Sequence, residues 1–74
     1  MPRLPQATPE DVARVARRAG FLQDRQRGSH AVWVHPTNGR RIVIPMHCGD
    51  LKRGTLRGIV ADMGLTVDEF IRLL

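Results

Sequence analysis

The stretch FLQDRQRGSHAVWVHPTNGRRIVIP, residues 21–45, decides the fold of this chain. After the helical spacing that precedes it the pattern changes, and three short runs in the stretch, 21–27, 29–36 and 41–45, each predict a strand. Arg27-Gly28 is a tight connection between the first two runs, and Asn38-Gly39 is a typical two-residue hairpin turn between the last two. The stretch therefore predicts a three-stranded antiparallel meander.

Helical patterns flank the meander on both sides. The first helix begins at the N-cap Thr8, ends at Gly20, and has apolar residues at helical spacing: Val12, Val15, Ala16 and Ala19. The second follows a loop over 46–53, ends at Gly64, and has a similar apolar face: Leu56, Ile59, Val60 and Met63. Residues 66–69 have the form of a capping box and start a short last helix.

A sheet of three strands is stable only when helices cover one of its faces. We therefore predict an α+β fold in the order helix, three antiparallel strands, helix and short helix, with the helices on one face. Residues 1–7 contain two prolines and no periodicity, and we expect them to form a loose N-terminal arm. Residues 8–74 are expected to form a single domain.

Two-residue turns at both connections would assign each strand residue to a face of the sheet. The bulky apolar set is then expected beneath the helices: Leu22, Ala31, Trp33, Ile42 and Ile44. The other set mixes basic residues with small β-branched ones and is expected on an open face: Gln23, Arg25, His30, Val32, Val34, Arg41 and Val43. This face is expected to be open to water or to a ligand.

Charge and size point to a polyanionic partner. The chain has 74 residues and a formal net charge of +5, and Lys52 is the one lysine among its 12 basic residues. A basic domain attracts nucleic acid at long range, and arginine makes two-point contacts with phosphate. A chain this short holds a single core and has no room for a deep enclosed active site, so a polymeric substrate is favoured over a small engulfed one.

The chain carries few residues suited to metals or disulfides. Cys48 is the only cysteine, which excludes an internal disulfide and fits a reducing compartment. The histidines at 30, 35 and 47 do not have the spacing of a zinc site, so we expect no metal and no cofactor. No run of about 20 apolar residues and no signal peptide is present, so we expect a cytoplasmic protein with no membrane partner.

His30 is the leading candidate for chemistry. It follows Gly28-Ser29 at the start of the middle strand and falls on the open face beside Arg25. An imidazole transfers protons near neutral pH, and a neighbouring guanidinium binds phosphate. The position alone also fits a surface histidine without a function, or one that caps the turn.

Motifs along the chain resemble the HicA (YcfA-like) toxin family. The similar segments are Ala19-Gly20-Phe21, Arg25-Gln26-Arg27-Gly28-Ser29-His30, His35-Pro36, Gly39-Arg40-Arg41, Ile44-Pro45-Met46-His47, Lys52-Arg53-Gly54-Thr55-Leu56 with Ile59, and Gly64-Leu65. The order and almost all of the spacing are those of the family. This chain departs from the pattern in a longer second hairpin and in Val34, where a polar residue is common.

The resemblance implies a fold similar to double-stranded RNA-binding domains and the activity of an mRNA interferase, an endoribonuclease of a type II toxin–antitoxin system. It implies RNA as substrate and a HicB-like antitoxin as protein partner. The histidine of the family's Gly-Ser-His motif is catalytic and corresponds to His30, with Gly28 as the motif glycine.

Further residues are candidates for binding RNA or for stabilising negative charge: Arg25, Arg27, Arg41, Lys52 and Arg53. Lys52 and Arg53 precede the second helix, where cations and backbone N–H groups favour anions, although a solvated basic loop fits equally. His47 is a candidate second acid or base, but a hydrogen bond that fixes its loop is the favoured interpretation. His35 is expected to be a half-buried core residue.

Two alternatives to an RNA-cleaving enzyme stay open. A relative of the same fold can bind RNA, or regulate, without cutting it. A DNA-binding regulator requires a recognition helix, and the second helix offers only Arg57 and Asp62 as charged readers.

Overall fold

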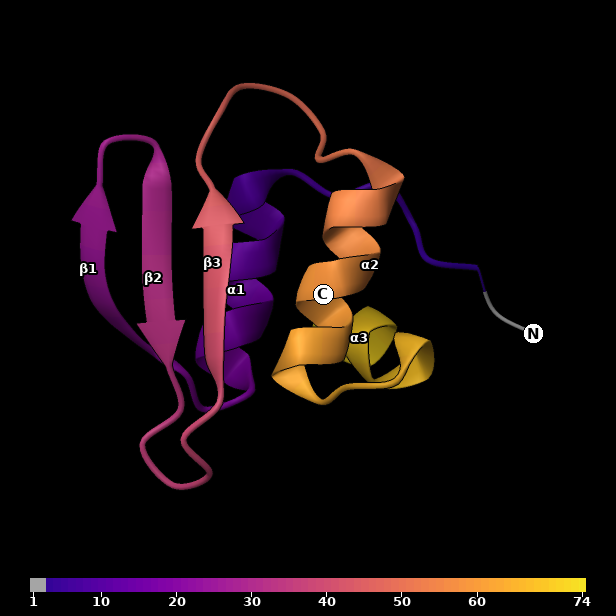
Figure 1. Cartoon of the computed structure of the whole chain (residues 1–74). Coiled ribbons are helices and arrows are strands. Elements are labelled where there is room, and N and C mark those ends of the chain that lie inside the picture. Colours follow the sequence, from indigo (N-terminus) through magenta and orange to yellow (C-terminus); the bar gives the residue numbers. More distant parts are fainter. Residues whose placement is uncertain (1–2) are drawn as a thin grey trace.

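A computed structural model describes residues 3–74 and shows an α+β domain (Figure 1). The elements are α1 (Pro9–Arg18), β1 (Leu22–Arg27), β2 (His30–Val34), β3 (Arg41–Pro45), α2 (Arg53–Met63) and α3 (Val67–Leu73). The strands form one antiparallel sheet in the order β1-β2-β3, and the helices lie on one side of it. The predicted fold class is confirmed. Within 3–74, no helix is long and apolar enough to cross a membrane.

Capping boxes start α1 and α3. The backbone N–H of Asp11 donates to Thr8 Oγ1 over 3.2 Å, and the N–H of Thr8 donates to the Asp11 carboxylate over 3.0 Å. Thr66 and Glu69 repeat the arrangement at α3. The donated backbone hydrogen bonds lower the pKa of both carboxyl groups below the ordinary values. The capping box predicted at residues 66–69 is thus confirmed.

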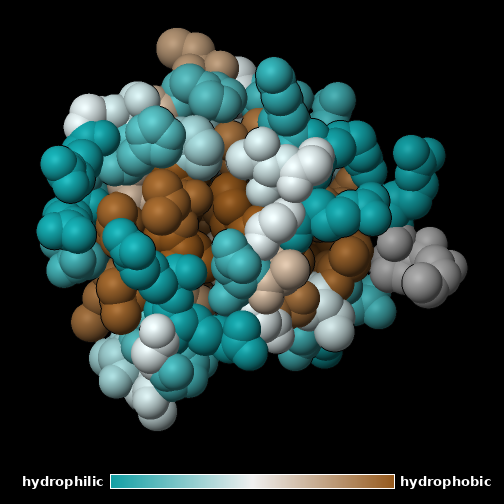
Figure 2. Space-filling model, in the orientation of Figure 1, coloured by the Kyte–Doolittle hydropathy of each residue, from teal (hydrophilic) through white to brown (hydrophobic). Residues whose placement is uncertain are grey.

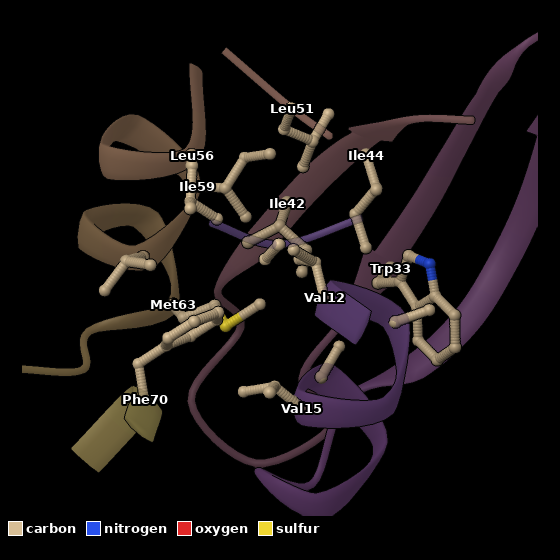
Figure 3. Packing of buried hydrophobic residues seen from close by; sticks show 14 of the residues in the cluster. Val12, Val15, Trp33, Ile42, Ile44, Leu51, Leu56, Ile59, Met63 and Phe70 are labelled. Atoms are coloured by element: carbon tan, nitrogen blue, oxygen red, sulfur yellow. The ribbon is translucent and has the colours of Figure 1, made fainter. Parts of the chain in front are cut away.

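The core lies between one face of the sheet and the three helices (Figure 3). Ile42 and Ile44 project from β3 toward Val12 of α1, Leu56 of α2 and Phe70 of α3, and all five are fully buried. Burial of each such side chain contributes roughly 1.5–3 kcal/mol. The apolar faces predicted for the helices therefore meet on the predicted side of β3.

The segment expected to be a loose arm is packed against the core over residues 4–7. Leu4 and Ala7 are only 5% and 1% exposed. The N–H of Leu51 donates to the carbonyl of Ala7 over 2.9 Å, and Arg53 Nη2 donates to the carbonyl of Leu4 over 2.8 Å. The low periodicity of the segment hid these contacts, because they are made with residues far along the chain. Residues 1–2 lie outside the described part.

The hairpin turns differ from those predicted. The first turn is Gly28-Ser29, so that Arg27 pairs with His30. The second connection is a longer loop over 36–39, closed by the N–H of His35 donating to the carbonyl of Arg40 over 2.8 Å. Both differences move the pairing by two residues, which preserves the face of each side chain because the side-chain period of a strand is two.

A β-bulge in β1 does change the faces. Gln23 pairs with Trp33 and Arg25 pairs with Val32, so that Asp24 is an extra residue without a partner. Leu22 therefore lies on the open face and is 62% exposed, although it was predicted beneath the helices. Gln23, predicted on the open face, lies on the helix side. Both assignments were wrong because a single extra residue reverses the alternation.

Candidate nucleic-acid interface

His30 lies on the uncovered face of the sheet, at the end of the first hairpin. In the Gly28-Ser29 turn, Gly28 has a positive φ of 56° and Ser29 does not. A two-residue turn with positive φ at its first position favours glycine there, because glycine has no Cβ. The turn sets His30 at the first position of β2, between Arg27 of β1 and Pro45 of β3. The imidazole is exposed, as the sequence predicted.

Three arginines share the open face with His30 but lie at different distances from it. Arg27 is directly opposite His30. Arg25 is two residues further along β1, with Nε 3.9 Å from the Asp24 carboxylate. Arg41 is at the other end of β3, about 13 Å from Pro45 along the strand. The register therefore makes Arg27, rather than Arg25, the cross-strand partner of His30.

The loop between β3 and α2 lies at the same end of the molecule as the Gly28-Ser29 turn (Figure 1). The N–H of Met46 donates to the carbonyl of Ser29, which ties this loop to the turn. His47, the next residue, is exposed, and its Nδ1 lies 2.9 Å from the carbonyl oxygen of Cys48. This contact to the backbone of its own loop is the one favoured from the sequence, and it leaves Nε2 available for a proton.

The two cations at the start of α2 differ in their surroundings. Lys52 occupies the N-cap position and is exposed, and its side chain makes no hydrogen bond or ion pair with any residue in the 3–74 range. Arg53 donates to the carbonyl of Leu4 and so holds the N-terminal segment. Lys52 is therefore the more available of the two for an external anion.

His35 serves the second hairpin. Its Nδ1 accepts hydrogen bonds from the N–H groups of Thr37 and Asn38 over 3.2 and 3.3 Å, and its ring meets Phe21 edge-on at 5.1 Å. It is half-buried, as predicted. In the described part of the chain, no group of three or more His, Cys, Asp or Glu side chains is placed to hold a metal ion.

An apolar patch occupies the middle of the open face. We define the open-face patch as Leu22, Val34 and Val43, with Val32, only 5% exposed, between β1 and β3 at its centre. Figure 2 shows this apolar surface over the strands, bordered by hydrophilic residues. The alternation in β2 and β3 places the three valines there from sequence alone, whereas Leu22 joins them only because of the bulge. A basic, partly apolar surface suits both a polyanion and a protein partner.

The helix–sheet–helix arrangement, with helices on one face and a basic face left open, defines a small domain of the double-stranded RNA-binding-domain type. A family model, the HicA toxin of bacterial toxin–antitoxin systems, matches residues 9–65. The chain belongs to the HicA toxin family. It is therefore a toxin whose system includes an antitoxin partner. A search of curated proteins finds no match.

Proposed function

We propose that this toxin is a metal-independent endoribonuclease that cleaves mRNA in the cytoplasm, with His30 as a catalytic residue. The observation that carries the proposal is the exposed imidazole of His30 opposite the guanidinium-bearing Arg27, on a sheet face that no helix covers. The membership of the HicA family supports it. The net charge of +5 favours association with an RNA chain.

RNA supplies its own nucleophile. The ribose 2′-oxygen attacks the adjacent phosphorus while the bond from phosphorus to the 5′-oxygen breaks, which yields a 2′,3′-cyclic phosphate and a 5′-hydroxyl end. One proton leaves the 2′-hydroxyl and one reaches the departing 5′-oxygen. His30 is suited to either transfer, a contribution of about 10² to 10⁴ in rate. The reaction requires no metal and no covalent enzyme intermediate.

The arrangement of cations suggests a division of roles. Arg27 is placed to stabilise negative charge on the phosphorane, because it is the cross-strand partner of His30. Arg25, Arg41 and Lys52 are suited to bind phosphates further along the RNA. Arg53 already donates a hydrogen bond to the carbonyl of Leu4, so it contributes to RNA binding through its positive charge rather than through a direct contact with phosphate.

His47 is the candidate for the second proton transfer. Its loop is joined to the turn before His30 by the bond from Met46 to Ser29. Its Nδ1 faces the Cys48 carbonyl, so Nε2 is the nitrogen open to substrate. A second histidine at this end of the sheet provides an acid to complement the base.

We further propose that a HicB-like antitoxin inhibits the toxin by covering the open face. The open-face patch offers the apolar contact that a protein interface needs at its centre, and the surrounding arginines favour an acidic partner. Occupation of this surface blocks His30 without any change in the toxin's conformation.

The test is cleavage of an unstructured RNA by the purified chain in the presence of a metal chelator. His30→Ala is expected to lower the rate at least 100-fold while RNA binding persists. Thr37→Ala, on the loop at the opposite end of β2, is the control and is expected to cleave like the unaltered chain. The cleavage rate of His47→Ala tests whether His47 carries out the second proton transfer, in which case the rate should fall.

Product chemistry sharpens the test. The proposal requires 5′-hydroxyl ends and cleavage that survives the chelator. RNA binding without cleavage by the unaltered chain would instead establish a non-catalytic RNA-binding module of the same fold.

A further inference from the structure

A polar slot lies between α1 and the edge strand β1, on the helix side of the sheet. Its volume is about 180 Å³, and it is open to solvent on one side. Glu10, Ala13 and Arg17 of α1 form one wall, Gln23 and Gln26 of β1 form the other, and Ala31, Trp33 and Met46 form the floor. Of these residues, only Met46 appears in the function proposed above, and there only through its backbone N–H.

The slot follows from the sequence of β1. On the helix side, β2 and β3 present apolar residues, whereas the positions of β1 that pair with Trp33 and Ala31 are Gln23 and Gln26. Figure 1 shows that α1 lies behind β3 and leaves β1 at the uncovered margin of the sheet. Two carboxamides thus stand where packing would require apolar side chains, and the space beside them is not filled.

Gln23, Gln26 and Trp33 each keep a donor or an acceptor that has no partner among the described residues. Gln26 Nε2 donates to the carbonyl of Gly28 over 3.2 Å, which leaves its Oε1 as an acceptor. Gln23 makes no side-chain hydrogen bond to any described residue. Trp33 is only 3% exposed, and its Nε1–H has no acceptor among residues 3–74. In Figure 3 this nitrogen lies on the edge of the ring turned away from Val12.

A flat ligand with apolar faces and a polar edge matches this slot. Nucleobases have this character, and glutamine carboxamides pair with base edges through one donor and one acceptor. The Arg17 Cζ lies 5.7 Å from the centroid of the Trp33 ring, and this planar guanidinium, together with the methyl and thioether groups of the slot, suits the face of a base. Single-stranded RNA is commonly recognised through bases turned out of the chain.

The slot is also close to the proposed cleavage site. Gln26 and Arg27 are consecutive residues of the edge strand, so their side chains lie on opposite faces of its free margin. An RNA chain that crosses Arg27 and His30 therefore reaches the slot by bending around β1. We propose that the slot is a base-binding subsite that gives the toxin a base preference near the cut. This inference rests on the proposed ribonuclease function.

The direct test is titration with the four nucleosides, observed by ¹H–¹⁵N NMR. Trp33 is the only tryptophan, so a single indole N–H resonance reports on the slot. Nucleosides carry no charge, which separates base binding from the attraction of a basic chain to anions. We expect at least one nucleoside to shift the Trp33 indole and the side-chain amide resonances of Gln23 and Gln26 saturably. Ribose 5-phosphate is expected to leave them unmoved.

Matched variants locate the binding. Gln26→Leu is expected to weaken nucleoside binding roughly tenfold. Gln6→Leu makes the same change at an exposed residue outside the slot and is expected to bind normally. Because Gln26 is exposed, circular dichroism should show both variants folded. Equal weakening by both variants, no nucleoside shift, or an equal shift with ribose 5-phosphate would overturn the proposal.

Cleavage assays separate this proposal from the one on which it rests. The Gln26→Leu variant is expected to lose the base preference: it should cleave the RNA sequences that the unaltered chain favours only as fast as the sequences that the unaltered chain does not favour. His30→Ala is expected to stop cleavage and leave the nucleoside titration unchanged. A nucleoside shift without cleavage by the unaltered chain would refute the ribonuclease and retain the slot. Cleavage without any nucleoside shift would refute the slot alone.

Discussion

Replacing Leu22 with alanine is expected to cost little stability, whereas the same change at the adjacent Phe21 is expected to cost several kcal/mol. Leu22 is 62% exposed and Phe21 is 2% exposed. Full burial of a leucine side chain contributes roughly 1.5–3 kcal/mol, and about two fifths of Leu22 is buried, so Leu22→Ala should lower the free energy of unfolding by about 0.6–1.2 kcal/mol. Phe21→Ala should lower it by roughly 3–5 kcal/mol.

Urea denaturation followed by circular dichroism measures both changes. A domain of this size has a free energy of unfolding of roughly 4–11 kcal/mol, so the Phe21 variant should lose a large part of it. The decisive result is the Leu22 value. A loss above about 2 kcal/mol would place this side chain in the core. The β-bulge at Asp24, and with it the place of Leu22 on the open face, would then be refuted.

The same variant tests the proposed antitoxin surface. If the partner covers the open face, the exposed part of Leu22 becomes buried in the complex, and Leu22→Ala should weaken binding by about 1–2 kcal/mol, or roughly 5- to 30-fold. Ile71→Ala is the matched control, because Ile71 is 40% exposed but belongs to α3, on the helix side. Isothermal titration with the antitoxin gives both values, and equal effects would argue against occlusion of the open face.

Two further predictions concern stability. The lowered pKa values of Asp11 and Glu69 mean that their ionised forms stabilise the fold at neutral pH, and this contribution is lost as the pH falls through the folded-state values, below about pH 4. The melting temperature of the unaltered chain should fall in this pH range, and that of the double variant Asp11→Asn, Glu69→Gln should fall less. An equal fall in the two proteins would contradict a stabilising role for these ionised carboxyl groups. Arg53→Ala removes the hydrogen bond to Leu4 and should cost about 1 kcal/mol. It should also speed amide exchange at Leu51, whose N–H is bonded to the same N-terminal segment, and unaltered exchange would show that the segment packs without Arg53.

The candidate site was predictable in its local parts. Gly28-Ser29-His30 lie together in the sequence, and the alternation of β2 places His30 away from Trp33 whatever the exact turn. The partner of His30 across the sheet was not predictable, because a shift of two residues in the turn replaces Arg25 with Arg27 and leaves the hydrophobic pattern equally satisfied.

The slot beside Trp33 was also beyond prediction from sequence. Gln23 and Gln26 lie on the same side of β1 only because Asp24 is an extra residue between them. In a regular strand, residues three apart point to opposite faces. The bulge therefore creates both the slot and the exposure of Leu22.

The sequence by itself determined the elements, their order and the α+β class, since these depend on caps, turns and apolar periods that act over a few residues. Its ordered motifs also indicated the family. Tertiary structure alone decided the face of Leu22 and Gln23, the pairing of Arg27 with His30, and the attachment of Arg53 to Leu4. Period-two alternation assigns faces only while the register is unbroken, and Leu4 and Arg53 meet only because α2 and the N-terminal segment pack on the same core.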